Sequence, residues 1–166
     1  MKPPSCETAA REYVTRGWPV APGPVCDGIT YRCGERRVTG PLTPVHDRVR
    51  EPDAVRHWWS SPRTILAPVG EAFDVLCMPV ALAAAAAVRL GGDRRCPVMF
   101  TPQGARVLVA PGARPRGVRL LDSAEWLPLP PSRLVPGSAV WWVSPADTDY
   151  RVGDAEAFEE AALDAA

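Results

Sequence analysis

Hydrophobic residues recur along the chain with two periods, one typical of helices and one typical of strands. The helical period predicts amphipathic helices over four segments, residues 7–16, 51–59, 81–90 and 155–165. Short apolar runs bounded by Gly or Pro predict strands over residues 18–22, 64–69, 73–78, 97–101, 106–110, 125–129 and 140–143. The last four runs indicate a meander in the second half of the chain.

Residues 22–45 follow neither period. They are rich in Gly and Pro and include Cys26 and Cys33, which predicts a long loop or a small knuckle. A loop of that length inside a compact domain needs something to staple it. The rest of the chain contains no low-complexity linker, so we predict a single domain over residues 1–150, followed by an acidic C-terminal helix or tail over residues 151–166.

The net charge of the chain and its distribution bear on whether the protein could bind nucleic acid. The 166 residues include 19 Lys and Arg against 19 Asp and Glu, so the formal net charge is zero. This balance argues against strong, unaided binding of duplex nucleic acid, which usually needs a positive excess. Basic residues nevertheless outnumber acidic ones between residues 32 and 119, and residues 154–164 are acidic. A local basic face therefore remains compatible with the composition.

The location of the protein follows from its apolar runs and its cysteines. No apolar leader segment follows Met1, and the longest apolar run, residues 80–88, is too short to span a bilayer. We therefore expect a cytoplasmic protein with no membrane partner. In that compartment the five cysteines are expected to be thiols or metal ligands rather than disulfides.

Several motifs occur in an order that is known from one protein family. The first ones are Arg16-Gly17-Trp18-Pro19-Val20 after a helix, a Cys-containing loop that ends near His46, and Trp58-Trp59; later come Phe73-Asp74-Val75 after Gly70, and Pro130-Pro131-Ser132. Over residues 7–145 this set resembles the N-terminal domain of bifunctional DNA primase/polymerases, especially the short stand-alone type common in actinobacteria. The resemblance implies an α+β, archaeo-eukaryotic primase-like fold with a mixed or antiparallel sheet flanked by helices.

The resemblance also implies a catalytic pattern, which this chain keeps only in part. Active members of the family hold two divalent metals with several carboxylates, because the attacking and leaving oxygens both need charge neutralisation. Asp74 matches the first acidic position, but Leu76 and Cys77 follow it, and Arg119 falls near a later acidic position. We therefore expect a catalytically degenerate domain. The alternative is an active DNA primase/polymerase with rearranged ligands, which would use Mg²⁺ or Mn²⁺. Asp74 is then either a remnant site residue or a turn and capping residue.

Cysteine and histidine residues raise the question of a structural zinc ion. Relatives of this type often carry a Cys-rich knuckle that closes with a His, and Cys26, Cys33 and His46 are the matching candidates here. A structural zinc site needs four ligands. The fourth would have to come through the fold, from Cys6, Cys96 or Asp27. The alternative, which we favour, is that Cys26 and Cys33 are semi-buried thiols and His46 is a surface residue.

Arginine and tryptophan side chains are the remaining candidates for binding. Arg106, Arg119 and Trp126 are predicted to contact a nucleotide or nucleic acid, because guanidinium groups bind phosphate and aromatic rings stack on bases. An exposed Trp near these arginines is equally typical of a protein-docking surface. We therefore expect a regulatory binding module. Its partner is either another protein, bound through this Trp/Arg surface or through the acidic C-terminal helix, or a nucleotide or nucleic acid.

Overall fold

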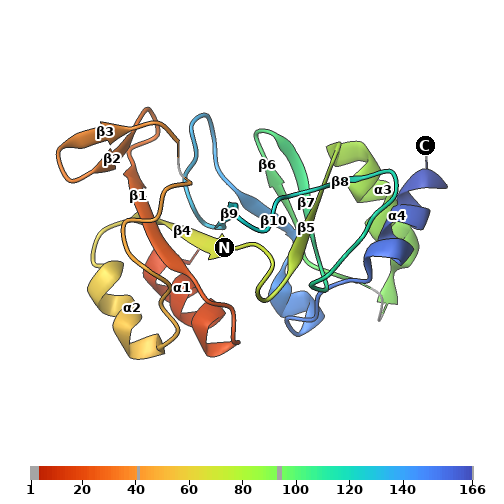
Figure 1. The fold of residues 1–166 in the computed structure, drawn as a ribbon, viewed down its shortest axis with the longest axis horizontal. Helices are drawn as coiled ribbons and strands as arrows, with labels where there is room; N and C mark the ends of the chain where they lie inside the picture. The colour runs from red at the N-terminus through yellow and green to blue at the C-terminus, as the bar shows by residue number, and fades with distance from the viewer. Residues whose placement is uncertain (1–3, 41, 93–94, 166) are drawn as a thin grey trace. The chain divides into compact units, whose positions relative to one another are not determined.

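A computed structural model describes residues 4–40, 42–92 and 95–165, and the chain divides into two compact units. Unit 1 comprises Met1–Pro68 and Ala124–Val140, and unit 2 comprises Val69–Ser123 and Trp141–Ala166. Each unit is built around one five-stranded sheet, so the α+β class expected from the sequence is confirmed. Figure 1 shows the elements with the labels used below.

Unit 1 has two helices and a sheet in the strand order β3-β2-β1-β4-β9. Its elements are α1 (Cys6–Thr15), β1 (Ala21–Cys26), β2 (Tyr31–Cys33), β3 (Arg36–Val38), α2 (Pro52–Trp58), β4 (Arg63–Pro68) and β9 (Trp126–Leu129). The pairings β1–β2, β2–β3, β1–β4 and β4–β9 are all antiparallel. The helices follow the predicted segments closely, because their apolar positions have helical spacing.

The strand expected over residues 18–22 lies later in the chain, and the expected loop over residues 22–45 is largely a pair of hairpins. Strand β1 contains Pro22 and Pro24, which cannot donate to a ladder. The β1–β4 register shifts between Pro22 and Val25, and the Thr64 hydroxyl donates to the Pro24 carbonyl at 2.8 Å. This irregularity lets a Pro-rich segment serve as an inner strand.

The motif Pro130-Pro131-Ser132 closes the core of unit 1. The Ser132 side chain is fully buried, and its Oγ accepts the N–H of Ile65 at 2.9 Å. The Tyr13 hydroxyl donates to the Pro130 carbonyl at 2.7 Å, and the Tyr13 ring stacks on Trp18. Helix α1 is thereby tied to the segment that follows β9.

Unit 2 has a sheet in the order β10-β6-β7-β5-β8. Its elements are β5 (Asp74–Met78), α3 (Val80–Leu90), β6 (Val98–Thr101), β7 (Gly104–Val109), β8 (Arg119–Leu120), β10 (Val140–Val143), the 3₁₀ helix η2 (Pro145–Thr148) and α4 (Ala155–Leu163). The pairings β5–β7, β5–β8 and β6–β7 are antiparallel. The predicted meander is wrong in one respect, because β9 pairs with β4 in unit 1.

Helices α3 and α4 supply the core of unit 2. They lie next to each other beside the strands of this unit (Figure 1). Helix α3 buries Ala83, Ala86, Ala87 and Leu90, and α4 inserts the fully buried ring of Phe158. Small alanine side chains allow the two helices to approach closely. The segment expected as an acidic tail therefore carries part of this core through α4.

Candidate functional site

Asp74 begins strand β5, and its carboxylate is bound by backbone groups. Its side chain is buried, with 6% of its surface exposed. Oδ2 accepts the N–H of Gly112 at 2.7 Å and that of Ala113 at 2.9 Å. Asp74, which the resemblance suggested as a catalytic acid, thus anchors the loop that follows β7, in keeping with the capping interpretation considered above.

Carboxylates do not converge around Asp74. Among residues 4–40, 42–92 and 95–165, no group of three or more His, Cys, Asp or Glu side chains lies close enough to hold a metal ion. The neighbour Leu76 belongs to the core under α3 and α4. Two-metal phosphoryl transfer needs several oxygen donors around the ions. The donor set of the described residues does not fit such a centre.

Arg106 and Arg119 are brought together by the register of unit 2. Cys77 of β5 lies opposite Arg106 of β7 on one side and opposite Arg119 of β8 on the other. Residues directly opposite each other in antiparallel strands share a face, and each pair of Cα atoms is about 5 Å apart. The two arginines therefore flank Cys77 on one face, with Cα atoms about 10 Å apart.

This face is turned away from the helical core of unit 2. Leu76 and Met78, on either side of Cys77, both belong to the core that α3 and α4 cover. Side chains alternate along a strand, so Cys77 and the two arginines lie on the other face. Arg106 is partly buried and its Nη1 donates to the carbonyl of Ala105 at 3.0 Å, whereas Arg119 is exposed. Within the described residues, neither guanidinium forms an ion pair.

Glu159 is a site residue that the sequence analysis missed. It lies on α4 with only 6% of its surface exposed. Its Oε2 accepts the N–H of Arg116 at 2.9 Å, and its Oε1 accepts those of Gly117 and of Val118, the latter at 3.0 Å. These backbone donors, first that of Arg116, lower the pKa of the Glu159 carboxyl. The sequence offered no signal for this, because Glu159 reads as one more acid in an acidic tail.

Trp126 belongs to unit 1, whereas Arg106 and Arg119 belong to unit 2. It begins β9 opposite Pro68, and the guanidinium carbon of Arg48 lies 5.6 Å from its ring centroid. This geometry is a cation–π contact. The structure thus groups Arg106 with Arg119, and groups Trp126 with Arg48.

Cys26, Cys33 and His46 do not form a metal-binding group in the structure. Cys26 is buried at the end of β1 opposite Tyr31, and Cys33 ends β2 opposite Arg36. The His46 ring packs against Trp58 instead, with ring centroids 4.1 Å apart.

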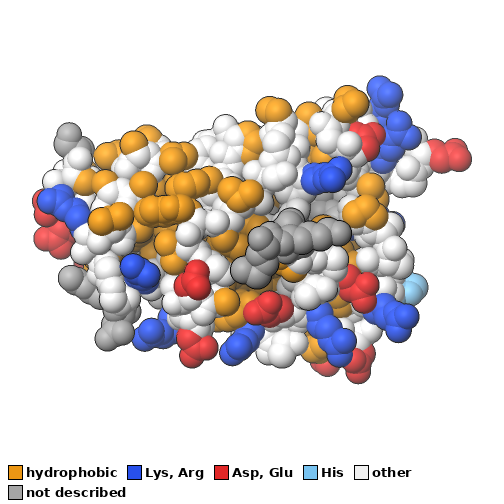
Figure 2. Space-filling view, turned by 180° about the vertical axis from the view of Figure 1, so that it is seen from behind, with side chains coloured by type: hydrophobic (Ala, Val, Ile, Leu, Met, Phe, Trp, Pro, Cys, Tyr) orange, Lys and Arg blue, Asp and Glu red, His pale blue; other side chains and the backbone are white. Residues whose placement is uncertain are grey.

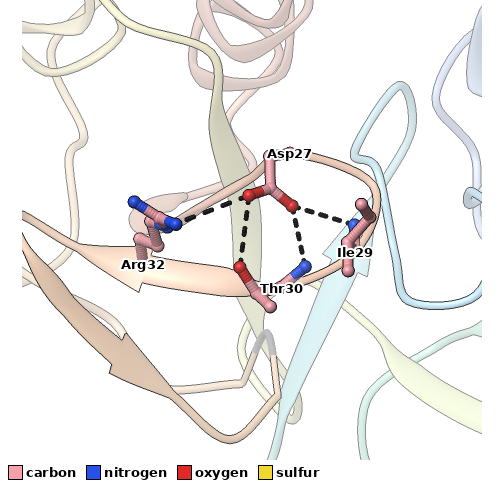
Figure 3. A network of polar contacts seen from close by, with 4 residues as sticks. All are labelled: Asp27, Ile29, Thr30 and Arg32. Atoms are coloured by element: carbon pink, nitrogen blue, oxygen red, sulfur yellow. Dashed lines mark hydrogen bonds and ion pairs between the residues drawn. The ribbon is translucent and has the colours of Figure 1, made fainter.

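The side chains considered as a fourth ligand have other roles. Burial raises the pKa of the Cys6 thiol, and it raises that of Cys96, in unit 2, to about 12. Asp27 organises the β1–β2 turn. Figure 3 shows its carboxylate accepting the N–H groups of Ile29 at 2.8 Å and Thr30 at 2.7 Å, with Arg32 3.8 Å away. These backbone bonds, first that from Thr30, lower the pKa of Asp27.

Apolar side chains are also exposed at several points of the surface. Figure 2 shows hydrophobic side chains gathering toward the left of that view. In unit 2, Val88 of α3 is 72% exposed and Leu163 of α4 is 64% exposed. Trp142 of β10 is also exposed, and it stacks on Phe100 with ring centroids 5.5 Å apart. Its neighbour Trp141 is only partly buried.

Comparison with protein-family models, with curated protein sequences and with solved structures gives no significant match. Within the described part of the chain, no helix combines the length and the apolar character that crossing a membrane requires.

Proposed function

We propose that this chain is a primase-polymerase-like domain without nucleotidyl-transfer activity, which binds nucleotides or nucleic acid in the cytoplasm as a regulatory module. The observation that carries the proposal is the row Arg106, Cys77 and Arg119 across three adjacent strands. Two guanidinium groups on one face, without acidic partners among the described residues, suit a ligand with more than one phosphate oxygen to bind.

The family assignment is part of the proposal, and it rests on the ordered motifs of the sequence. The loss of catalysis is supported by the environment of Asp74. Its Oδ2 accepts the backbone N–H groups of Gly112 and Ala113, and among the described residues no cluster of acids stands beside it. An active primase/polymerase with rearranged ligands would need those acids to converge.

Nucleotide binding is tested by titrating the protein with fluorescently labelled ATP and following fluorescence anisotropy. The double variant Arg106→Ala/Arg119→Ala should lower the affinity at least about tenfold, because each charge-assisted phosphate contact contributes roughly 1.5 kcal/mol or more. The matched control is Arg36→Ala/Arg37→Ala, which removes two exposed arginines from β3 in unit 1. Equal affinity for all three proteins, or no binding by the wild type, would refute the role of the row.

A protein partner is a second candidate, favoured by the exposed apolar side chains Val88 and Leu163 on α3 and α4. Truncation before α4 is a poor test of it, because Phe158 belongs to the core of unit 2. The charge reversal Glu156→Lys/Glu160→Lys changes two exposed acids of α4 and leaves that core intact. Unchanged association with a captured partner would argue against a role for the acidic helix.

A further inference from the structure

A small cavity lies within unit 2, and we call it the α4 cavity because the start of α4 supplies part of its wall. Its other walls come from the end of α3 and from the segment before β6. The volume is about 200 Å³. Pockets for drug-sized ligands usually measure roughly 300–1,000 Å³. The α4 cavity therefore suits a smaller molecule.

The floor of the α4 cavity is apolar. Leu90, Cys96 and Phe158 are buried members of the core, and Ala157 packs against them. Burial raises the pKa of the Cys96 thiol to about 12, so this side chain is neutral at physiological pH. A Cβ atom at Gly153 would lie 2.7 Å from that of Cys96, so only glycine allows the backbone to form this wall. The floor thus offers apolar contact without charge.

The mouth of the α4 cavity is cationic. Two of its lining residues, Arg95 and Arg151, are exposed. Neither guanidinium forms an ion pair within residues 4–40, 42–92 and 95–165. Asp154 is the acid among the described lining residues, and its Oδ1 accepts the N–H of Ala157 at 2.8 Å. Two cations against one carboxylate leave the mouth with a net positive charge.

The backbone that carries Arg151 is held in an unusual conformation. Asp149 and Tyr150 have positive φ angles of 49° and 58°, which are uncommon for residues other than glycine. The Tyr150 N–H donates to the carbonyl of Pro145 at 2.7 Å, and the Arg151 N–H donates to that of Thr148 at 3.0 Å. The Arg151 Nε donates to the same Thr148 carbonyl at 3.3 Å. Because these contacts already order the segment, an anion that binds Arg151 pays less conformational entropy.

We propose that the α4 cavity binds a small carboxylic acid, with its carboxylate at Arg95 and Arg151 and its apolar chain or ring on the floor. Guanidinium groups match the planar carboxylate geometry, and the floor gains from covering apolar surface. Inorganic phosphate would leave the floor uncovered, and an apolar amine would meet two like charges. The site shares no residue with the row Arg106, Cys77 and Arg119, so it goes beyond the proposed function.

The first test measures binding of acetate, butanoate and hexanoate to the full chain by isothermal titration calorimetry. Affinity should rise about fourfold for each methylene group that is buried. Hexylamine and inorganic phosphate should bind at least about tenfold more weakly than hexanoate. Amide NMR shifts on adding hexanoate should be largest at Cys96, Gly153 and Ala157. Equal affinity for acetate and hexanoate, or shifts centred on another part of the chain, would refute the site.

The second test uses variants of the mouth and of the floor. Arg95→Gln/Arg151→Gln changes two exposed side chains and should lower hexanoate affinity at least about tenfold. The matched control, Arg36→Gln/Arg37→Gln on β3, should leave it within twofold. Ala157→Leu should also weaken hexanoate binding, because the larger side chain fills the floor and keeps both arginines.

The outcomes also separate this proposal from nucleotide binding. If Arg106→Ala/Arg119→Ala loses ATP binding but still binds hexanoate as the wild type does, two independent sites are established. If Arg95→Gln/Arg151→Gln binds hexanoate as tightly as the wild type, or if the wild type does not bind hexanoate at millimolar concentration, the α4 cavity is not a carboxylate site.

Discussion

Asp27 in unit 1 and Glu159 in unit 2 both hold a loop by accepting backbone N–H groups, but their partners lie at very different distances along the chain. Asp27 accepts from Ile29 and Thr30, two and three residues ahead. Glu159 accepts from Arg116 and Val118, which lie 43 and 41 residues before it. The first contact forms within one turn, whereas the second requires α4 to be docked on unit 2.

The difference matters because the loop held from a distance, residues 110–119, carries the exposed side chains of Arg114, Arg116 and Arg119. A local turn such as the one at Asp27 forms from residues that are neighbours in the chain. The loop over residues 110–119 depends on Asp74 and Glu159, so its order requires that β5 and α4 are both folded. The candidate binding residue Arg119, at the end of this loop, is therefore coupled to the folding of unit 2.

The largest effect is expected for Glu159→Gln. The glutamine amide keeps one oxygen that can accept a hydrogen bond. Its NH₂ group is itself a donor, so it cannot accept the backbone N–H groups that the second carboxylate oxygen bound. We expect a loss of about 2–3 kcal/mol in the free energy of unfolding, measured by urea denaturation followed by circular dichroism. Glu160→Gln, next to it on the exposed side of α4, is the control and should change stability by less than about 0.5 kcal/mol. Equal effects of the two substitutions would show that the remote contact does not hold the loop.

A smaller effect is expected for Asp74→Asn, because the asparagine retains an oxygen that can accept at least one of the two N–H groups. The expected loss is about 1–2 kcal/mol in the same denaturation experiment. Primer synthesis with Mg²⁺ or Mn²⁺ should be absent in both the wild type and the variant, and ATP affinity should be unchanged. Robust synthesis by the wild type that disappears in the variant would establish the active primase/polymerase alternative. Asp53→Asn, at an exposed carboxylate of α2, serves as the control.

The smallest expected effect is a change in how steeply the free energy of unfolding falls as the pH is lowered. The pKa values of Glu159 and Asp27 are both lowered in the folded protein, mainly by backbone N–H donors. A lowered folded pKa favours folding above the unfolded pKa, and this contribution disappears as the pH falls through the folded pKa. Stability measured from pH 7 to pH 3 should therefore fall less steeply in Glu159→Gln than in the wild type. In Asp27→Asn the curve should stay close to that of the wild type, because the turn at Asp27 is exposed and local. If the pH dependence of stability flattened more in Asp27→Asn than in Glu159→Gln, the local turn would contribute more to acid sensitivity than the remote contact does.

Most elements of the fold were predictable, because their signals are local. The helical spacing of Ala9, Ala10, Tyr13 and Val14 located α1, and the four buried positions of α1 are these same residues. The hairpin between β1 and β2 was missed although Asp27-Gly28, a typical turn dipeptide, was present in the sequence. The two-residue strand β8 was missed because it is too short to show a period, and it exists only by pairing with β5.

The candidate site was predictable in part. Arg106 and Arg119 were selected as binding residues, and their common position opposite Cys77 appears only once β5 is paired with both β7 and β8. Trp126 was selected with them, but strand pairing assigns it to β9 in unit 1. Strand pairing joins residues that are far apart in the chain, and no local pattern encodes which strands meet.

By itself, the sequence determined where helices begin and end, which segments are extended, and that the chain lacks a run of acids around Asp74. These properties depend on residue type and short-range spacing. Only the tertiary structure decided that Asp74 and Glu159 bind backbone N–H groups of one loop, and that Arg106 and Arg119 share a face. The physical reason is that a buried carboxylate is stable wherever the fold supplies enough donors, and those donors come from residues about 40 positions away.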